Sequence, residues 1–450
     1  MKLTFCGAQK RVTGSCYLLE TSKTKILVDC GMIQGSRVGE QLNFEPFPFD
    51  PSKIDIVLIT HAHLDHTGRI PKLVREGFSG RIIATAATNN LAKLIMEDST
   101  RILASEAQRH DHAPLYTEED FARTEPLFED AEYHTPLRVD DNVSIEFFDA
   151  GHILGSSSIR ITDGDTSIVF SGDLGNPPVP LLRATDHIDA ADYVVMESTY
   201  GGRVHEDKET RTLLLKSIIY ETVQMKGVLM IPAFAMERTQ ELLYELNTLV
   251  NEKHIPPVPI FLDSPLAIKA TRVFQESEVY FNKETQDMIK SGDDVFDFPG
   301  LKMTLETDES KAIANFPAPK VIIAGSGMAH GGRILHHIKK YISNFANTYL
   351  IVGYQVQGTL GRQILDGKKK IKVHGEEFDV KAKVKAIGGY SAHGDQPKLT
   401  EWVSSFDRKR LKKVFITHGE EDQADALQRH LQQSLDAEII VPTELDSVEL

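Results

Sequence analysis

The sequence has few cysteines. Its 450 residues include only three, Cys6, Cys16 and Cys30, which are odd in number and lie close together. A disulfide-stabilised secreted domain would carry a larger, even set. We therefore expect reduced thiols, whose main role is packing, in a cytoplasmic protein.

Long apolar runs are also absent. The N-terminal segment MKLTFCGAQKRVTGSCYLLE alternates like a strand and lacks the uninterrupted apolar stretch of a signal peptide or a membrane span. No repeat or low-complexity tract stands out. These absences predict a soluble, unexported protein with no membrane contact.

Positive charge is in short supply. Lys and Arg number 50 against 65 Asp and Glu, which gives a formal net charge of −15. Such a balance argues against general adhesion to nucleic acid, because phosphate contacts come from clustered Lys and Arg. A polyanion can still bind where positive charge gathers in a cleft or on bound metal ions.

Strand-like runs that end in polar or Gly-rich segments are what the sequence has in quantity. They are KTKILVDCG, IDIVLITHAHLDH, SIEFFDAGH, TSIVFSGDLG, YVVMESTYGG and KKVFITHGE. Helical patterns separate them, including a start at Thr117 with Asp120 three residues on. The fold class is therefore predicted to be layered α/β.

The chain is too long for one hydrophobic core, so we expect two domains. From about residue 204 strands and helices alternate as in a parallel sheet, and a core helix is expected after Glu237. Metal-type residues occur both before and after this region. The predicted organisation is thus a first domain at 1–203, an inserted domain at 204–389, and the rest of the first domain at 390–450.

The strongest chemical signal is HAHLDH, which follows the apolar strand IDIVLIT. It places four ligand-type side chains within six positions: His61, His63, Asp65 and His66. Imidazole and carboxylate groups suit zinc. The alternative, four solvated loop residues, is disfavoured because so dense a cluster seldom arises without a ligand to hold.

In these motifs the chain resembles the metallo-β-lactamase superfamily. Asp29 in LVDCG, the HAHLDH segment, His152 in GHILGSSS and Asp173 in SGDLG follow the order of the family motifs. The resemblance implies two Zn²⁺ ions, one held by His61, His63 and His152 and the other by Asp65, His66 and His418, with Asp173 bridging. It also implies that Asp29 binds none of the metals but orients the ligands. An iron-binding relative of this fold has an acidic residue where this chain has His63, so the resemblance favours zinc over iron.

The inserted region resembles the β-CASP domain of nucleic-acid-processing relatives. Its marks include Glu197 in ESTYGG (motif A), His393 in GGYSAHGDQ (motif B) and His418 in ITHGEED (motif C). The resemblance implies an αββα metallo-β-lactamase sandwich with an inserted α/β β-CASP domain. Histidine at motif C points to the RNA-processing branch, and the chain resembles the short prokaryotic homologues, without KH domains, of the cleavage and polyadenylation specificity factor endonuclease.

The function implied by this resemblance is a zinc-dependent ribonuclease, an endonuclease with 5′-exonuclease action left open. A hydroxide held by the metals would attack phosphorus, and Asp65 would take part in catalysis. His393, paired with Glu197, would act as general acid. RNA is the expected partner, and a homodimer is left open.

Two Gly-rich turns are candidates for phosphate contact. The candidate residues in and beside these turns are Ser326, Gly327, Arg333 and Arg362. For the two arginines the alternative to phosphate contact is a surface salt bridge. Lysines from Lys368 to Lys372 are predicted to form a solvated hairpin edge, with RNA contact less favoured. Glu237 stands where many family members have Gly, and the sequence offers no interpretation of it.

Three other functions remain as alternatives. The first is a DNA-directed β-CASP nuclease, which histidine at motif C disfavours. The second is hydrolysis of a thiolester or lactone, which the full motif A to C set disfavours. The third is a non-catalytic RNA-processing subunit. The sequence disfavours it because every expected metal-ligand residue is present.

Overall fold

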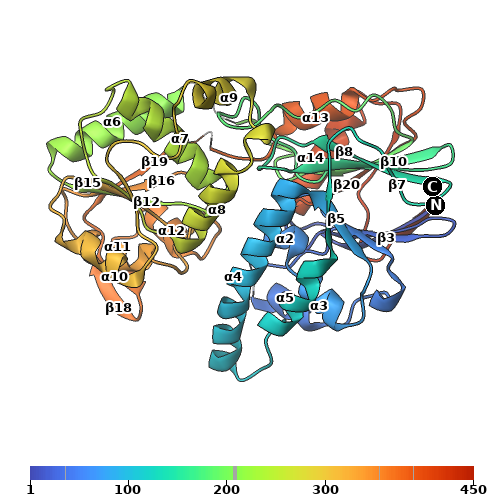
Figure 1. Cartoon of the computed structure of the whole chain (residues 1–450), viewed down its shortest axis with the longest axis horizontal. Coiled ribbons are helices and arrows are strands. Elements are labelled where there is room, and N and C mark those ends of the chain that lie inside the picture. The colour runs from blue at the N-terminus through green and yellow to red at the C-terminus, as the bar shows by residue number, and fades with distance from the viewer. Residues whose placement is uncertain (36, 206–209, 354, 389) are drawn as a thin grey trace. The chain divides into compact units, whose positions relative to one another are not determined.

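The structure is a computed structural model that describes the chain except for residues 36, 206–209, 354 and 389 (Figure 1). It divides into two compact units. Unit 1 combines Met1–Val204 with Ala392–Leu450, and unit 2 is His205–Ser391. The sequence places the inserted segment at 204–389, and the last of these positions lies outside the described residues.

Two seven-stranded sheets form the centre of unit 1. The first has the order β22 (Ser447–Glu449), β1 (Lys2–Gly7), β2 (Cys16–Glu20), β3 (Lys25–Val28), β4 (Ile56–Leu58), β5 (Arg81–Thr85) and β6 (Phe128–Ala131). The second has the order β21 (Glu438–Ile440), β20 (Lys413–Thr417), β11 (Tyr193–Glu197), β10 (Thr166–Phe170), β9 (Ser157–Asp163), β8 (Val143–Asp149) and β7 (Leu137–Arg138).

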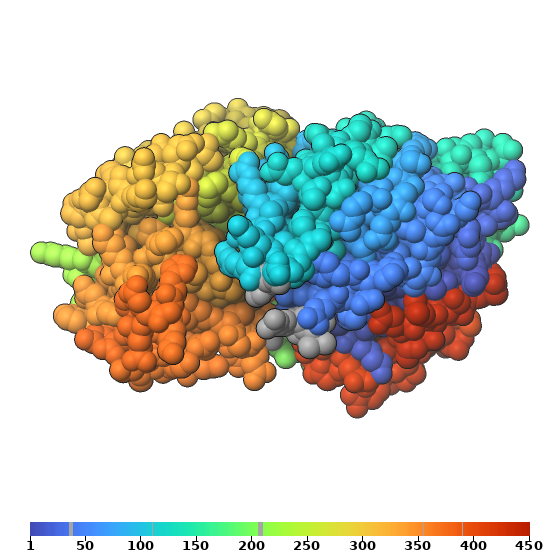
Figure 2. Space-filling view, turned by 90° about the horizontal axis from the view of Figure 1, so that it is seen from below, coloured from blue at the N-terminus to red at the C-terminus, as the bar shows by residue number. Residues whose placement is uncertain are grey.

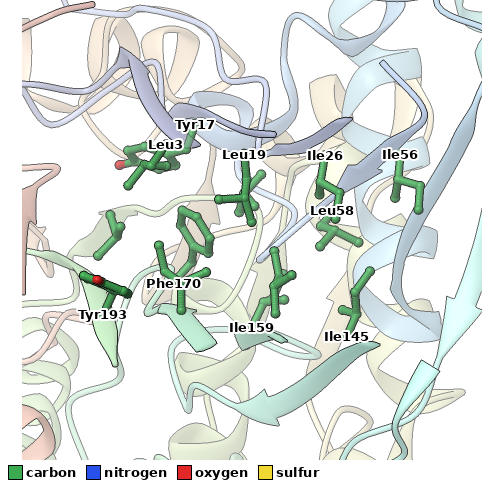
Figure 3. Close-up of a cluster of buried hydrophobic side chains, with 14 of the residues drawn as sticks. Leu3, Tyr17, Leu19, Ile26, Ile56, Leu58, Ile145, Ile159, Phe170 and Tyr193 are labelled. Atoms are coloured by element: carbon green, nitrogen blue, oxygen red, sulfur yellow. The ribbon is translucent and has the colours of Figure 1, made fainter. Parts of the chain in front are cut away.

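The two sheets pack face to face, because alternate residues of each strand point to the same side. On β20, Phe415 points into the core between the sheets, whereas Val414 and Ile416 point to the outer face. Figure 3 shows the opposed side chains of this core, among them Leu3, Tyr17, Leu19, Ile26, Ile56 and Leu58 from the first sheet and Ile145, Ile159, Phe170 and Tyr193 from the second.

Helices cover the outer faces and complete an αββα sandwich. Those of unit 1 are α1 (Arg37–Gln41), α2 (Leu64–Thr67), α3 (Ile70–Arg75), α4 (Ala86–His110), α5 (Glu118–Thr124), α13 (Gln396–Ser404) and α14 (Glu421–Leu431). Leu399 and Trp402 of α13 and Leu427 of α14 pack on the outer face of the second sheet. On the first sheet, α4 lies along β5 and β6.

The two ends of the chain meet in the first sheet. Strand β22 pairs antiparallel with β1, and the backbone N–H of Leu450 donates to the carbonyl of Met1 at 2.9 Å. Figure 2 shows the last segments of the chain (red) against the first ones (blue). Unit 1 is therefore closed by residues from both ends of the sequence.

Unit 2 is built on a parallel sheet of six strands. Their order is β14 (Leu301–Met303), β13 (Ile260–Leu262), β15 (Lys320–Ala324), β12 (Val228–Pro232), β16 (Thr348–Ile351) and β19 (Lys383–Ala386). Strands β17 (Lys370–Val373) and β18 (Glu376–Asp379) form a separate hairpin. The helices are α6 (Arg211–Gln224), α7 (Arg238–Asn251), α8 (Pro265–Gln275), α9 (Lys283–Lys290), α10 (Thr307–Ala312), α11 (Ile334–Tyr341) and α12 (Leu360–Leu365).

Several local predictions are confirmed. All six strand-like runs form strands, and Thr117 and Asp120 make a reciprocal capping box at the start of α5. The helix after Glu237 is α7, and Leu242, Leu243, Leu246 and Leu249 are buried on it. The three cysteines are free and buried. Among the helices described, none is both long and apolar enough to cross a membrane.

Candidate metal centre

The HAHLDH segment lies where β4 turns into α2. His61 follows the strand, and His63 has extended backbone (φ −60°, ψ 147°) as the residue that precedes α2. Asp65 and His66 then lie in the single turn of α2. The change from extended to helical backbone lets the first two histidines point to one place and the next pair to another.

The remaining ligand-type residues also lie just past strand ends. His152 follows β8, Asp173 follows β10 and His418 follows β20. His418 has a positive φ of 46°, a backbone conformation that non-glycine residues seldom adopt. Such backbone persists when the surrounding structure imposes it, which is common at functional sites.

The first candidate set comprises His61, His63, His152 and Asp173, whose ligand atoms all lie within 4.8 Å of one another. The Nε2 atom of His61 lies 3.0 Å from Nδ1 of His63, and Nε2 of His152 lies 3.3 Å from the same atom. Three imidazoles thus converge on one point beside a carboxylate.

The second candidate set comprises Asp65, His66 and His418. Oδ2 of Asp65 lies 4.0 Å from Nε2 of His66 and 3.9 Å from Nε2 of His418. Asp65 is partly exposed, whereas both histidines are buried. This set therefore has one side open toward solvent.

Asp173 joins the two sets through its separate oxygens. Oδ2 lies 3.5 Å from His61 and 3.6 Å from His152, whereas Oδ1 lies 3.4 Å from both His66 and His418. In a tetrahedral zinc site with bonds of about 2.0–2.1 Å, neighbouring ligand atoms lie roughly 3.3–3.4 Å apart. The spacing fits two metal ions that share this carboxylate.

Unsatisfied buried atoms support the same fit. Nε2 of His66 and Oδ1 of Asp173 are buried and have no hydrogen-bond partner among the described residues. A buried polar atom without a partner is costly, so a native structure normally supplies one. A divalent cation between these two atoms would satisfy both.

The electrostatics of the first set also suit a metal. Burial lowers the pKa of His61 and His152 well below the usual value, and it lowers the pKa of His63 to about 4. The three imidazoles are therefore neutral near pH 7, and a neutral imidazole nitrogen is the form that binds a metal. Burial opposes the charge of Asp173, but the surrounding histidines, His418 and His66 foremost, lower its pKa well below the ordinary value.

Groups behind the ligands fix their orientation. Oδ2 of Asp29 lies 2.7 Å from Nδ1 of His66, and Asp29 also accepts hydrogen bonds from the backbone N–H and the hydroxyl of Thr60. Nδ1 of His418 lies 2.9 Å from the hydroxyl of Ser15, and Nδ1 of His61 lies 3.1 Å from that of Thr60. Each contact leaves the Nε2 atom of the histidine facing the centre.

Glu197 and His393 form a pair beside the first set. Nδ1 of His393 lies 3.3 Å from Oε2 of Glu197 and 3.7 Å from Oδ2 of Asp173. Burial lowers the pKa of His393, but the charges of Glu197 and Asp173 outweigh burial and raise it to about 9. The His393 side chain is 23% exposed, whereas that of Glu197 is fully buried. A protonated imidazole is thus held at the open side of the centre.

The four candidate phosphate contacts lie in unit 2, and the two arginines differ. The guanidinium of Arg333 donates to Asp263 at 2.9 Å and to the carbonyls of Thr304 and Leu305, both at 2.8 Å. That geometry favours a structural role for Arg333. Among the residues that the structure describes, the guanidinium of Arg362 pairs with Asp366, four residues further along the chain, at 2.9 Å, and this pair is exposed. Ser326 and Gly327 lie in the turn after β15.

Three family models match this chain. They describe the metallo-beta-lactamase superfamily over residues 10–198, the Beta-Casp domain over residues 239–364, and the Zn-dependent metallo-hydrolase RNA specificity domain over residues 377–442. The first includes HAHLDH, His152, Asp173 and Glu197, and the last includes His393 and His418.

Relatives of the chain are similar over most of their length. A ribonuclease of Thermus thermophilus is 38% identical over 427 residues, which cover 95% of each chain. A transcription termination factor, FttA, of Methanosarcina mazei is 31% identical over 100% of this chain and 72% of its own. An RNase J-like protein of Methanocaldococcus jannaschii is 30% identical over 98% of this chain and 97% of its own.

A solved structure has the same fold. A protein of unknown function from Enterococcus faecalis V583 superposes with a TM-score of 0.59 at 13% identity, and the match covers 100% of this chain and 99% of that one. At this identity the likeness concerns the fold alone.

Proposed function

This chain belongs to the β-CASP family of the metallo-β-lactamase superfamily, and from that premise we propose that it is a zinc-dependent ribonuclease. The proposed reaction is hydrolysis of RNA phosphodiester bonds, with products that carry a 5′-phosphate and a 3′-hydroxyl. The main support for the proposal is that the two carboxylate oxygens of Asp173 face different histidines. Oδ2 lies 3.5 Å from His61, and Oδ1 lies 3.4 Å from both His66 and His418, distances close to those between neighbouring ligands of a tetrahedral zinc ion.

Two metal ions at these positions would supply a Lewis acid for the phosphate and a water of lowered pKa. Their four positive charges would exceed the two negative charges of Asp65 and Asp173. The centre would therefore attract phosphate even though the chain has a net charge of −15. Asp65 and His63 are the partly exposed members of the two sets.

His393 is proposed as the proton donor to the departing oxygen. Nδ1 of His393 faces Glu197, so the proton given to the departing oxygen would come from Nε2. Glu197 is itself fixed by the backbone N–H of Leu174, which donates to Oε1 at 2.6 Å. The pair keeps a proton available near neutral pH without using a metal ligand.

RNA as the substrate class is supported by the ribonuclease relative at 38% identity and by His418 at the third motif of the inserted-domain family. Ser326, Gly327 and Arg362 are proposed to contact phosphate. Arg333 is left out of this set because its guanidinium is taken up by Asp263 and two carbonyls.

The proposal is tested by incubating the purified chain with a labelled single-stranded RNA and with duplex DNA of matched sequence. Metal content is measured on the same preparation, and Asp65→Ala serves as the inactive control. We expect about two zinc ions per chain, and cleavage of RNA much faster than of DNA.

Other outcomes would point elsewhere. Faster cleavage of DNA would indicate a DNA-directed nuclease, and turnover of a thiolester alone would indicate the smaller hydrolases of this fold. A chain without metal and without activity would be a non-catalytic subunit. Mapping the cuts in one RNA that carries a 5′-triphosphate, and again with a 5′-monophosphate, separates endonuclease from 5′-exonuclease action.

A further inference from the structure

A hollow of about 440 Å³ lies in unit 2 between α12, β19 and the start of the β17–β18 hairpin. Its floor is apolar and includes Ile364, Val380, Ala382 and Val384, and its rim carries Lys368, Lys369 and Lys385. This volume is within the range of roughly 300–1,000 Å³ that small-ligand sites have. In Figure 2 the hairpin region (dark orange) is at the surface of the molecule.

The segment that forms this hollow carries a net positive charge, whereas the whole chain is negative. Between Arg362 and Lys385 there are eight basic and four acidic side chains, a net charge of +4 in a protein of −15. Such local concentration is what phosphate binding requires, whatever the sign of the whole molecule.

Only part of this charge is neutralised by neighbours. Lys370 pairs with Glu377 at 2.9 Å, and Lys385 lies 3.5 Å from Glu221. Lys368 donates to the amide oxygen of Gln363 at 2.7 Å, which leaves its charge uncompensated. In the part of the chain that the structure describes, neither Lys368 nor Lys369 forms a salt bridge.

Lysines can also serve to blunt an exposed strand edge, and β19 is an edge strand. That role needs solvated side chains on the strand. Lys368 and Lys369 instead precede β17 and border the hollow. An apolar floor under an ammonium rim matches a sugar-phosphate chain, whose phosphates need cations and whose sugars present apolar carbon. None of the described residues that line the hollow is aromatic, so base stacking on these side chains contributes nothing.

We propose that this hollow binds the phosphate backbone of single-stranded RNA at nucleotides away from the bond that is cut. The inference rests on the proposed function and adds a second point of contact to it. Binding there is independent of base sequence and matters only for RNA long enough to reach both the metal centre and the hollow.

The test compares the double variant Lys368→Ala/Lys369→Ala with Lys283→Ala/Lys290→Ala, which removes two exposed lysines from α9 of the same unit. Both are made in the full chain, and RNA binding is measured at several salt concentrations in an Asp65→Ala background, which prevents cleavage. Cleavage of a trinucleotide and of a 20-nucleotide RNA is measured in the active background.

We expect the first double variant to bind the 20-nucleotide RNA more weakly and to lower the salt dependence of log K by about 1.4, or about 0.7 per lost contact. Its cleavage of the trinucleotide should equal that of the parent, and the α9 variant should match the parent throughout. An unchanged salt dependence, or an equal loss in the α9 variant, overturns the hollow as a site while the proposed function stands. A parent that neither binds nor cuts RNA overturns both.

Discussion

Asp65 is a partly exposed ligand-type side chain of the candidate metal centre. Replacement by Ala removes one ligand and one negative charge from the second set of ligands. Asp65→Ala should therefore abolish RNA cleavage and lower bound zinc from about two ions to about one per chain. Elemental analysis and a cleavage assay measure the two effects. Asp425→Ala, which removes an exposed carboxylate from α14, is the matched control, and full activity in Asp65→Ala would contradict the two-metal centre.

We expect His393→Ala and His418→Ala to have different effects. Nε2 of His418 lies 3.9 Å from Asp65 and 3.4 Å from Asp173, whereas His393 pairs with Glu197 at 3.3 Å and lies 3.7 Å from Asp173. His393→Ala should keep its zinc and its RNA affinity and lose about 10² to 10⁴ in cleavage rate, the usual worth of a positioned acid. His418→Ala should lose zinc as well.

A substrate whose leaving oxygen is replaced by sulfur distinguishes the two histidines further. Sulfur needs less protonation, so this substrate should recover much of the His393→Ala defect and little of the His418→Ala defect. If both variants lose zinc equally, or if sulfur rescues neither, His393 is a ligand or a structural residue instead of the acid.

Asp149, at the end of β8, gives a dependence of stability on pH. Burial, aided by the nearby charge of Asp186, raises the pKa of Asp149 from 3.8 to about 7, although the backbone N–H of Gly151 stabilises the ionised form. Between these pH values the folded chain binds more protons than the unfolded one. The free energy of unfolding therefore falls as pH rises from about 4 to about 7, and the loss is complete above that.

Asp149→Asn keeps an acceptor for Gly151 and removes the buried charge. It should stabilise the chain by a few kcal/mol at pH 8 and by clearly less at pH 5.5, on the scale of about 1.4 kcal/mol per pKa unit. Thermal unfolding at both pH values measures the difference. An equal gain at the two values would show that Asp149 keeps an ordinary pKa.

At the scale of elements, one buried carboxylate ties together the two places where the chain enters and leaves unit 2. Oε1 of Glu245 on α7 lies 2.6 Å from Nε of Arg211, the first residue of α6, and Oε2 accepts a hydrogen bond from the hydroxyl of Tyr390 at 2.7 Å. The guanidinium of Arg211 also lies over the ring of Tyr390, 4.6 Å from its centre. The start of α6 and the end of unit 2 are thus held by the same side chain.

Glu245→Ala should destabilise unit 2 by up to about 3–5 kcal/mol, because it removes the nearer of the two carboxylates that face the buried guanidinium of Arg211 and leaves only Glu241, at 4.0 Å, among the ion pairs described. Asp287→Ala breaks the exposed pair with Lys283 on α9 and should cost no more than about 0.5 kcal/mol. Urea unfolding of both variants provides the comparison. Similar costs would mean that the Glu245 pair is solvated in solution.

The elements themselves were largely predictable from sequence, because each strand-like run and the Thr117 capping box depend on residues a few positions apart. Gathering of the ligand-type residues was predictable from family motifs, which preserve their order along the chain. The contacts of Ser15 with His418 and of Thr60 with His61 could not be predicted, because no motif or regular spacing in the sequence shows which hydroxyl will lie next to which histidine. The structural role of Arg333 depends on Asp263, 70 positions away, and only the folded sheet brings the two together.

For the whole molecule, the metals are expected to add stability as well as reactivity. A ligand that binds only the folded state stabilises it by RT ln(1 + [L]/Kd). Chelation should therefore lower the melting temperature and abolish cleavage, and added zinc should restore both in a concentration-dependent way. Magnesium is the control, since it prefers oxygen ligands. A melting temperature that chelation leaves unchanged would contradict metal binding at the buried histidines.

Because unit 1 takes its strands from both ends of the chain, its assembly has an order in time. On a ribosome that adds roughly 5–20 residues per second, unit 2 is complete before β20, β21 and β22 exist. The loop that carries His418 emerges among the last segments to be made. A nascent or prematurely terminated chain that ends before Lys413 lacks this histidine. If His418 holds a metal as proposed, an unfinished copy therefore cannot cut the messenger RNA to which it is still attached.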